Sequence, residues 1–395
     1  MTKRILIFSL AYYPSHVSGA EVAIKEITDR VSPDDITFSM VTHRFEKKAL
    51  RVEQIGNVQV HRVGIGPSYL SKILFIPLAA LTAARLHRKN PFDGSWVMMT
   101  YMLFPLVCAK ICGLRGPYAL TLQDGDPYEK VFERWFIRPF SPILNWGFRN
   151  ASMVQTISGY LSTWPKRRGY RYSVEIIPNG ASTQSAETFS DEELLPLNNL
   201  LSKTSGDIFL LSIGRLVHQK AIDVVIRALA LLPEHIKLAV VGEGPDKVLL
   251  TRLVNELHLQ TRVHFIGQVD RTETAKYRRV CDIFVLPSRS EGQGISFMST
   301  MLSGMPVITT QVGGIADFLF DAKRNPDQIT TGWAVDVDSP EQIAEAVEHI
   351  LSDTQKVKQV TENARRLIKE KYDWDVIAKD MTRKVFSKIT MKVAK

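Results

Sequence analysis

The sequence predicts an α/β protein of two domains, each built on a parallel β-sheet covered by helices on both faces. Three observations support this. A chain of 395 residues is too long for one typical core. Strand-like and helix-like segments alternate along the first half, which favours a parallel sheet. After residues 182–206, which lack a clear period, the alternation starts again.

Short apolar runs predict the strands of the first domain, residues 1–181. They lie at 5–10, 37–42, 58–63, 96–100, 118–122, 153–156 and 174–177, and a glycine turn leads into a helix at 20–31. The start of the chain resembles a signal peptide, but we favour a first buried strand because no small-residue cleavage site follows.

An uncharged run at residues 73–84 has two interpretations. It is shorter than the roughly 20 residues needed to span a bilayer. A buried helix is the favoured interpretation. The alternative is a helix lying in the membrane interface, because Lys72, Arg85, Arg88 and Lys89 bracket the apolar run.

The second domain, residues 207–373, repeats the pattern after a short helix at 191–201 in the linker. Strands are expected near 209–213, 238–241, 263–267 and 283–286, and helices at 222–232, 294–303, 340–351 and 354–370. Gly304 and Pro306 end the helix that starts at Gly294. A last helix starts near Trp374 and continues towards residue 395.

The loop and helix start at residues 288–296 are suited to a sugar nucleotide. A glycine turn entering a helix leaves backbone N–H groups unpaired at the positive end of the helix dipole, which favours phosphate. Glu291 would repel phosphate, so it is expected to face neutral hydroxyls. Arg215 and Lys220, on a loop after another strand, can neutralise a diphosphate.

Composition limits the other function classes. The net charge of +9 favours acidic partners, such as phosphorylated substrates or an anionic membrane face. Basic and aromatic residues mix at 164–172, yet no nucleic-acid-binding module accompanies them, so no nucleic-acid partner is expected. The three cysteines form no disulfide framework and no zinc spacing, which fits a reducing cytoplasm. Asp124-Gly-Asp126 has the form of a metal-binding D-x-D, but three residues are a weak signal and no metal is expected.

The stretch from Ser288 resembles the donor-binding motif of the GT4-type retaining glycosyltransferases, S-x-x-E-G-x-G followed by a helix. Glu291, Gly292 and Gly294 match, whereas the family's second Glu is Ser299 here. Four further patterns follow the same family: Gly214, Arg215, Leu216 and Lys220 in G-R-L-x-x-x-K-G, with Ala221 for the last Gly; the F-x-G loop before Gln268 and Val269; Gly19 and Glu21 after Ser18; and Asp317 ending P-V-I-T-T-Q-V-G-G-I-A-D.

This resemblance implies the GT-B fold, with two Rossmann-like domains whose parallel sheets face each other across a cleft. The last helix, 374–395, would pack back on the first domain. It implies Arg215, Lys220 and Glu291 as catalytic residues, and it places Gln123, where the family usually has His, and Asp124 on the acceptor side. The implied donor-binding residues are Gly19, Gly214, Gln268, Val269, Gly292, Gly294, Ile295, Ser296 and Ser299.

The function expected from this resemblance is transfer of a hexose-type sugar from a nucleotide-diphosphate donor to an acceptor hydroxyl, without metal or cofactor. The charge and the basic segments favour a lipid-linked or envelope-polysaccharide acceptor at the cytoplasmic face of the cell membrane. Two alternatives remain. One is a sugar-nucleotide epimerase with the same fold, and the other is a catalytically decayed nucleotide-sugar-binding protein, for which Ser299 and Gln123 are the argument.

Overall fold

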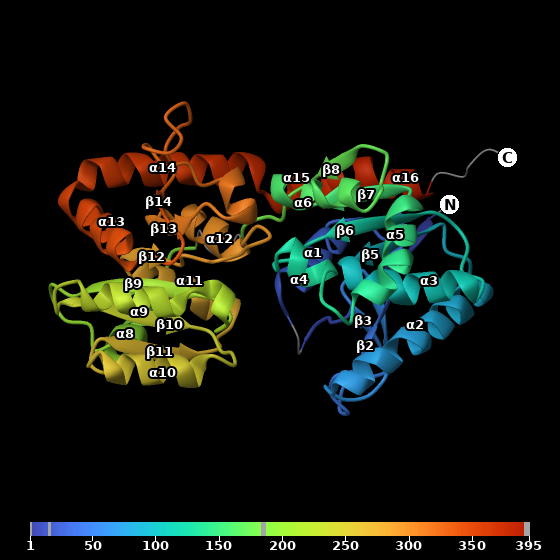
Figure 1. Cartoon of the computed structure of the whole chain (residues 1–395), viewed down its shortest axis with the longest axis horizontal. Coiled ribbons are helices and arrows are strands. Elements are labelled where there is room, and N and C mark those ends of the chain that lie inside the picture. Colours follow the sequence, from blue (N-terminus) through green and yellow to red (C-terminus); the bar gives the residue numbers. More distant parts are fainter. Residues whose placement is uncertain (1, 15–16, 183–186, 391–395) are drawn as a thin grey trace. The chain divides into compact units, whose positions relative to one another are not determined.

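The computed structural model describes residues 2–14, 17–182 and 187–390. The chain forms two units (Figure 1): unit 1 holds residues up to Asn179 and those from Trp374 on, and unit 2 is Gly180–Asp373. The first domain was predicted to extend to residue 181, and unit 1 extends to Asn179. The predicted linker is also not a separate segment, because Leu197 and Leu201, in and just after helix α8 (Asp191–Leu200), lie in the core of unit 2. Residues 183–186 of that linker lie outside the described residues.

Unit 1 is built on an eight-stranded sheet in the order β3-β4-β2-β1-β5-β6-β7-β8. All pairs are parallel except β3–β4. Its elements before residue 180 are β1 (Lys3–Phe8), α1 (Gly19–Thr28), β2 (Ile36–His43), β3 (Val52–Ile55), β4 (Val58–Val63), α2 (Tyr69–Lys89), β5 (Gly94–Met98), η1 (Thr100–Met102), α3 (Leu103–Ile111), β6 (Tyr118–Leu122), α4 (Tyr128–Phe132), η2 (Arg138–Phe140), α5 (Ser141–Arg149), β7 (Met153–Thr156), α6 (Gly159–Ser162), α7 (Trp164–Arg167) and β8 (Val174–Ile176).

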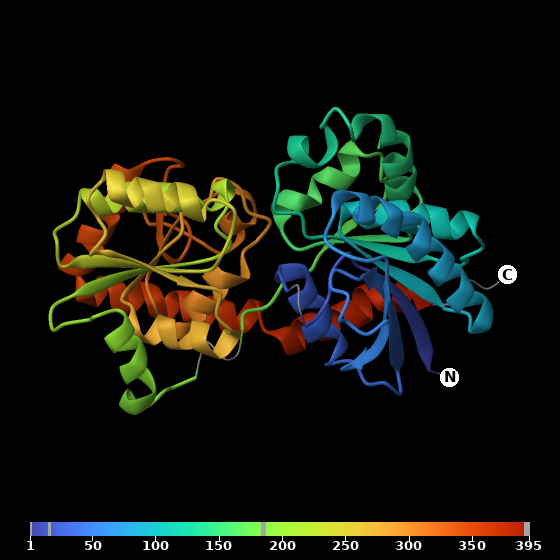
Figure 2. The same cartoon turned by 90° about the horizontal axis from the view of Figure 1, so that it is seen from below.

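All seven predicted strands of this unit are present, and β3 is an eighth that the sequence did not predict. Its four residues, Val-Glu-Gln-Ile, alternate between half-buried and exposed positions at the sheet edge, so they carry little apolar signal. The central strands read as continuous apolar runs because helices cover both faces of the sheet, which Figure 2 shows.

Unit 2 is built on a six-stranded, fully parallel sheet in the order β11-β10-β9-β12-β13-β14. Besides α8, its elements are β9 (Ile208–Ile213), η4 (His218–Lys220), α9 (Ile222–Ala230), β10 (Ile236–Val241), α10 (Lys247–Glu256), β11 (Val263–Gly267), α11 (Arg271–Val280), β12 (Ile283–Val285), α12 (Ile295–Ser303), β13 (Val307–Thr310), η5 (Gly313–Asp317), β14 (Trp333–Val335), α13 (Pro340–Ser352) and α14 (Thr354–Lys371).

The end of the chain belongs to unit 1. It consists of α15 (Trp374–Asp380), a π-helical turn η6 (Met381–Phe386) and α16 (Ser387–Thr390). The Phe386 ring packs edge-on against Trp96 at 5.0 Å and Phe38 at 5.5 Å, measured between ring centroids. Residues 391–395 of the predicted last helix lie outside the described residues.

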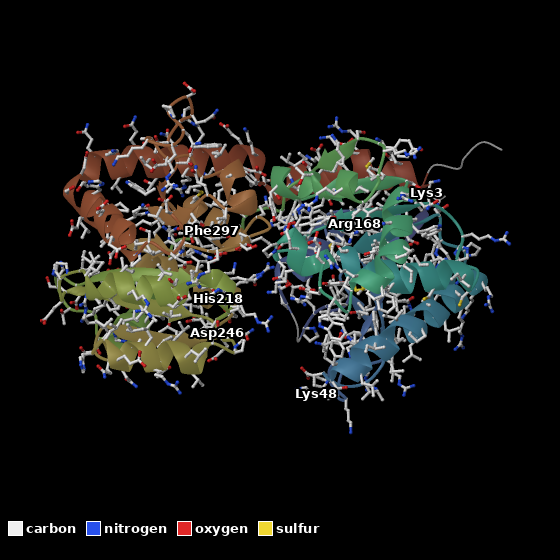
Figure 3. The ribbon with its side chains drawn as sticks, viewed as in Figure 1. Lys3, Lys48, Arg168, His218, Asp246 and Phe297 are labelled. Atoms are coloured by element: carbon white, nitrogen blue, oxygen red, sulfur yellow. The ribbon has the colours of Figure 1, made fainter. Side chains whose placement is uncertain are left out.

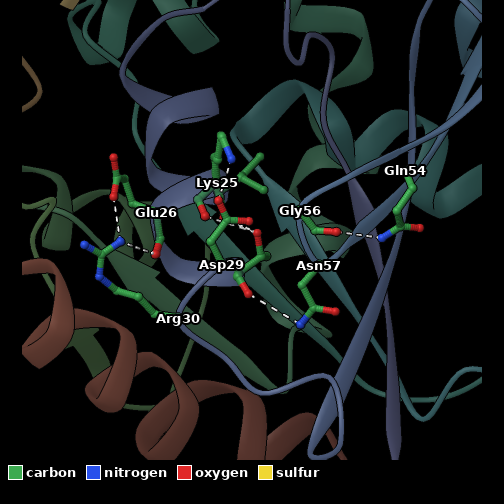
Figure 4. A network of polar contacts seen from close by, with 9 residues as sticks. Lys25, Glu26, Asp29, Arg30, Gln54, Gly56 and Asn57 are labelled. Atoms are coloured by element: carbon green, nitrogen blue, oxygen red, sulfur yellow. Dashed lines mark hydrogen bonds and ion pairs between the residues drawn. The ribbon is translucent and has the colours of Figure 1, made fainter. Parts of the chain in front are cut away.

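A polar network fixes helix α1 to the sheet of unit 1 (Figure 4). The side-chain amide of Asn57 donates to the carbonyls of Val31 and Ile36, at 2.9 and 3.0 Å. The preceding Gly56 has a φ of 54°, and a Cβ there would lie 1.9 Å from the Asp29 carboxylate. Only glycine therefore lets this turn approach the end of α1.

Helix α2 differs from the favoured expectation of a buried helix. Phe75 and Ala79 are buried on one face, but Leu70 and Leu81 on the other are more than half exposed. The expectation is correct for one face only.

Candidate nucleotide-sugar site

The strand order of unit 2 reverses at β9. Strands β10 and β11 lie on one side of it, and β12, β13 and β14 lie on the other. In parallel sheets, ligands bind at such a switch point, outside the carboxyl ends of the strands. The loops that follow β9 and β12 carry the three residues predicted to be catalytic, Arg215, Lys220 and Glu291.

Lys220 and Glu291 form an ion pair at this switch point. The Lys220 ammonium donates a hydrogen bond to the Glu291 carboxylate, and both side chains are largely buried. Ala221 follows with a φ of 52°, a left-handed conformation that favours glycine, which explains why the related pattern has Gly at this position. Two residues predicted for separate roles therefore neutralise each other's charge.

Arg289 links the same two loops, and sequence reasoning missed it. Its backbone N–H donates to the carbonyl of Gln219 at 2.7 Å, and its guanidinium donates to the carbonyl of His218 at 2.6 Å. The guanidinium also forms a two-pronged bond with Asp223, at 3.0 and 2.7 Å, and reaches Asp338 at 2.7 Å.

Burial alone would lower the pKa of Arg289, but its hydrogen bonds to Asp223 and Asp338 raise it overall. Arg289 therefore stays charged and joins the β9 loop, helix α9 and the segment after β14. The sequence did offer a signal for this contact. Arg289 lies two residues before Glu291, and its partner Asp223 lies three residues after Lys220.

The glycines of the β12 loop shape the start of helix α12. Gly294 has a φ of 92°, and a Cβ there would lie 2.4 Å from the Phe297 ring and 3.3 Å from the Glu291 carboxyl carbon. Phe297, which is labelled in Figure 3, lies in unit 2 and is fully buried. Its ring packs edge-on against the ring of Phe284. From the neighbouring turn, the N–H of Gly314 donates to the Glu291 carbonyl at 3.1 Å.

The N-terminus of α12 is available to an anion. Among the described residues, no side chain caps this helix. The first N–H groups of a helix, here those near Ile295 and Ser296, have no partner within the helix. Gly292 lies in the same turn and is buried.

Arg215 and Gly214 leave the sheet at the end of β9. The Gly214 N–H donates to the Val241 carbonyl at 3.0 Å, which continues the strand pairing. The Arg215 side chain is exposed, and within residues 2–14, 17–182 and 187–390 it forms no ion pair. Arg215 is therefore a cation at the strand end whose charge the described chain leaves unneutralised.

Gln268 and Val269 follow β11, two strands away from β9. Gln268 is exposed, whereas Val269 packs partly against the core of unit 2. Of these two residues, Gln268 is therefore the one whose side chain is exposed to solvent.

Ser299 is buried in α12 and already has a partner. Its hydroxyl accepts a hydrogen bond from the backbone N–H of Ser182, at 3.0 Å. The Ser299 hydroxyl keeps its own O–H donor and a second lone pair for a further hydrogen bond.

The predicted residues of unit 1 lie at the carboxyl edge of the other sheet. Gln123 exchanges two amide hydrogen bonds with Asn179, at 3.2 and 3.0 Å. Asp124 is buried and accepts a hydrogen bond from the Thr100 hydroxyl at 3.1 Å. Burial raises the pKa of Asp124 to about 6. Next to Thr100, Met99 has a φ of 71°, a strained backbone for a residue with a side chain.

Gly19 starts helix α1 and is exposed. The Glu21 carboxylate reaches back and accepts hydrogen bonds from the N–H and hydroxyl of Ser18, at 2.7 and 2.5 Å. The Glu21 carboxylate therefore already occupies the N-terminus of helix α1.

In the described residues, no three His, Cys, Asp or Glu side chains group together as metal ligands.

Comparisons with known proteins agree with this arrangement. Residues 199–367 match the family model of glycosyl transferases group 1. The chain is 30% identical over 210 residues to the uncharacterized glycosyltransferase MJ1607 of Methanocaldococcus jannaschii, and this match spans 52% of each protein. It is 23% identical to MJ1178 of the same organism over 96% of this chain and 97% of that one.

A third relative is the alpha-monoglucosyldiacylglycerol synthase of Streptococcus pneumoniae, 35% identical over 35% of this chain and 33% of that protein. Two solved structures share the fold. Sucrose-phosphate synthase from Thermosynechococcus elongatus has a TM-score of 0.83 at 19% identity, covering 98% of this chain and 99% of that one. Anabaena Alr3699/HepE in complex with UDP and glucose has a TM-score of 0.78 at 20% identity, covering 98% and 100%.

The sequence match covers the unit that carries the Lys220–Glu291 pair, and the fold match covers both parallel sheets. Residues 199–367 therefore resemble the glycosyl transferases group 1 family, and the chain has the GT-B fold.

Proposed function

We propose that the protein transfers a hexose-type sugar from a nucleotide-diphosphate donor to an acceptor hydroxyl, with retention of configuration. The observation that carries this proposal is the junction of the β9 and β12 loops, where the Lys220–Glu291 pair lies beside the uncapped turn of α12. Cations and N–H groups there suit a diphosphate, and a carboxylate suits the hydroxyls of a sugar.

In this proposal, the Lys220–Glu291 ion pair must break when the donor binds. A diphosphate competes with Glu291 for the Lys220 ammonium, and the released carboxylate becomes free to accept hydrogen bonds from the donor sugar. Negative charge then builds on the diphosphate as the bond to the sugar breaks. Lys220, Arg215 and the N–H groups of 294–296 stabilise that charge in the transition state.

Retention follows if the acceptor attacks the face of the sugar that the leaving diphosphate occupies. The departing phosphate oxygen then takes the proton of the acceptor hydroxyl, so the step balances without a protein base. In this proposal the charge is met by side chains and backbone N–H groups, and neither a metal nor a cofactor has a role.

A uridine diphosphate sugar is the first donor to test. Anabaena HepE, which shares the fold, has been solved with UDP and with UDP-glucose. These complexes support a uridine diphosphate sugar as the donor. Because glucose is a hexose, the complex with UDP-glucose also supports a hexose as the transferred sugar.

For the acceptor we propose a lipid-linked sugar or a growing envelope polysaccharide, at the cytoplasmic face of the cell membrane. The net charge of +9 supports a negatively charged partner. The name of the relative from Streptococcus pneumoniae, a glucosyldiacylglycerol synthase, supports a lipid acceptor.

The test is turnover of UDP-, GDP- and ADP-sugars by the full chain, with Lys220→Ala and Arg215→Ala beside it. We expect each substitution to lower kcat by about 100-fold or more, because each removes stabilisation of the leaving group. Lys247→Ala is the matched control, because Lys247 pairs with Glu243 on the surface of the same unit. Unchanged turnover in both site variants would refute the assigned roles.

The same assay separates the two alternatives. An epimerase would convert the donor with no acceptor present and would release no nucleoside diphosphate. A decayed binding protein would show a raised melting temperature with a nucleoside diphosphate, but no turnover on any donor.

A further inference from the structure

Helix α2 presents an apolar face that the described residues of unit 1 leave uncovered. Six large apolar side chains on it are between 42 and 69% exposed: Tyr69, Leu70, Ile73, Leu74, Leu78 and Leu81. They recur at spacings of three and four residues, so they form one stripe along the helix from Tyr69 to Leu81. Contiguous exposed apolar patches of this kind mark docking surfaces.

The opposite face fixes how α2 lies. Phe75, Ala79 and Ala83 are buried in the core of unit 1, and α2 runs alongside α3 on the outer side of that unit (Figure 1). By length and hydropathy alone α2 could cross a membrane. Crossing would pull its buried face out of the core, so the geometry favours a helix that lies on a surface.

The charges on α2 select the partner. Lys72, Arg85, Arg88 and Lys89 are exposed, and the 21 residues of the helix contain no acidic residue. Among the described residues, none of these four cations forms an ion pair, although Arg88 donates to the Cys112 carbonyl at 3.2 Å. An apolar stripe flanked by unneutralised cations complements anionic headgroups over an apolar layer.

We propose that the exposed face of α2 docks unit 1 on an anionic lipid bilayer. The apolar stripe enters the boundary between headgroups and acyl chains, and the basic residues contact the headgroups. This proposal rests on the proposed function. Docking on the bilayer would bring the enzyme to the membrane that holds a lipid-linked acceptor.

The experiment is flotation of the full chain with vesicles of zwitterionic phospholipid, with and without an added anionic phospholipid, at low and high salt. One variant combines Leu74→Ser and Leu78→Ser, and a second combines Arg85→Gln and Arg88→Gln. The matched controls lie in unit 2. Val248→Ser with Leu249→Ser removes two exposed apolar side chains of α10, and Lys356→Gln with Lys358→Gln removes two exposed charges of α14.

We expect binding to anionic vesicles that weakens at high salt. The serine pair should lower the partition coefficient at least tenfold, and the glutamine pair by about 25-fold, since each basic residue near an anionic surface contributes about fivefold. The unit 2 controls should float like the natural sequence. All variants should keep turnover of a soluble nucleotide sugar in the absence of vesicles.

Three results would overturn the proposal. The first is no flotation with any vesicle, and the second is equal flotation of the α2 variants and their controls. The third is a serine pair that floats like the natural sequence but no longer self-associates. The last would assign the stripe to a second copy of the chain. Failure of the proposed function looks different, because flotation would then persist while no donor is turned over.

Discussion

Arg289 was not among the residues predicted from the sequence to form the site. Replacing it by alanine tests whether the positions of Lys220 and Glu291 depend on it. Arg289 joins the loop of Lys220 to the loop of Glu291 through His218, Asp223 and Asp338. Alanine removes every hydrogen bond of the guanidinium. The Asp223 carboxylate at the start of α9 then loses this partner, and the β12 loop keeps its link to η4 through the Lys220–Glu291 pair and the backbone N–H of residue 289.

The size of the effect follows from the exposure of each partner. The two-pronged bond to Asp223 involves an Arg289 side chain that is only 15% exposed, and it contributes about 1.5–3 kcal/mol. Asp338 is 55% exposed, so its bond contributes no more than about 1 kcal/mol. Arg289→Ala should therefore lower the free energy of unfolding of unit 2 by about 2–4 kcal/mol.

The catalytic effect follows from displacement of Lys220 and Glu291. A misplacement of about 1 Å costs about 100-fold in rate, so kcat should fall about 10- to 100-fold, more than KM rises. Arg289→Lys should be intermediate in both properties, because lysine keeps the charge but cannot form the two-pronged bond.

The assays are urea unfolding and steady-state donor turnover, each measured on the folded variant. Arg324→Ala is the control, because Arg324 forms an exposed ion pair with Asp336 in the same unit. It should change stability by less than about 1 kcal/mol and leave kcat unaltered. If Arg289→Ala resembles this control in both assays, Arg289 does not hold the two loops together.

Three further predictions concern other positions. Gly294→Ala should destabilise unit 2 by about 2–4 kcal/mol in urea unfolding, because the left-handed backbone and a Cβ 2.4 Å from the Phe297 ring both cost energy. Gly304→Ala has a similar φ of 84° and nothing within 4 Å of its Cβ, so it should cost only about 1–2 kcal/mol, and an equal loss would refute the packing argument. Glu291→Gln should bind UDP as tightly as the natural sequence or more tightly, since it frees Lys220, yet should turn over donor far more slowly; calorimetric titration showing weaker UDP binding would contradict the competition. Asp124 has a folded-state pKa raised to about 6 by burial, so its contribution to stability is present below its unfolded pKa and is lost as the pH rises towards 6, by about 3 kcal/mol in all. Asp124→Asn should flatten that part of the stability–pH profile, and an unchanged slope in urea unfolding between these pH values would assign it to another group.

The sequence predicted the sheets well because buried parallel strands leave a strong local signal. Strands such as β1 and β9 are continuous apolar runs between helix patterns, and the helix that starts after Gly294 ends at Gly304 as expected. The signal failed at β3, which is short and alternates at the sheet edge. It also failed at α2, where apolar composition was interpreted as burial although half of the helix surface is exposed.

The contacts within the site could not be predicted in the same way, because they join residues far apart in the chain. Lys220 and Glu291 are 71 positions apart, and Ser182 and Ser299 are 117 apart. A motif places each residue on a loop at a strand end, but it does not say which other protein group the side chain contacts. Glu291 pairs with the Lys220 ammonium, a partner that the motif did not indicate.

The chemistry of the two cations reconciles these observations. Arg289 is a planar, permanently charged group held by several acceptors at once, so breaking one bond leaves it in place. Lys220 has a flexible stem and a point charge with a single carboxylate partner, so it can exchange that partner for a phosphate. The β12 loop therefore combines a fixed arginine with an exchangeable pair. If Lys220→Arg were to retain full turnover, the need for this exchange would be refuted.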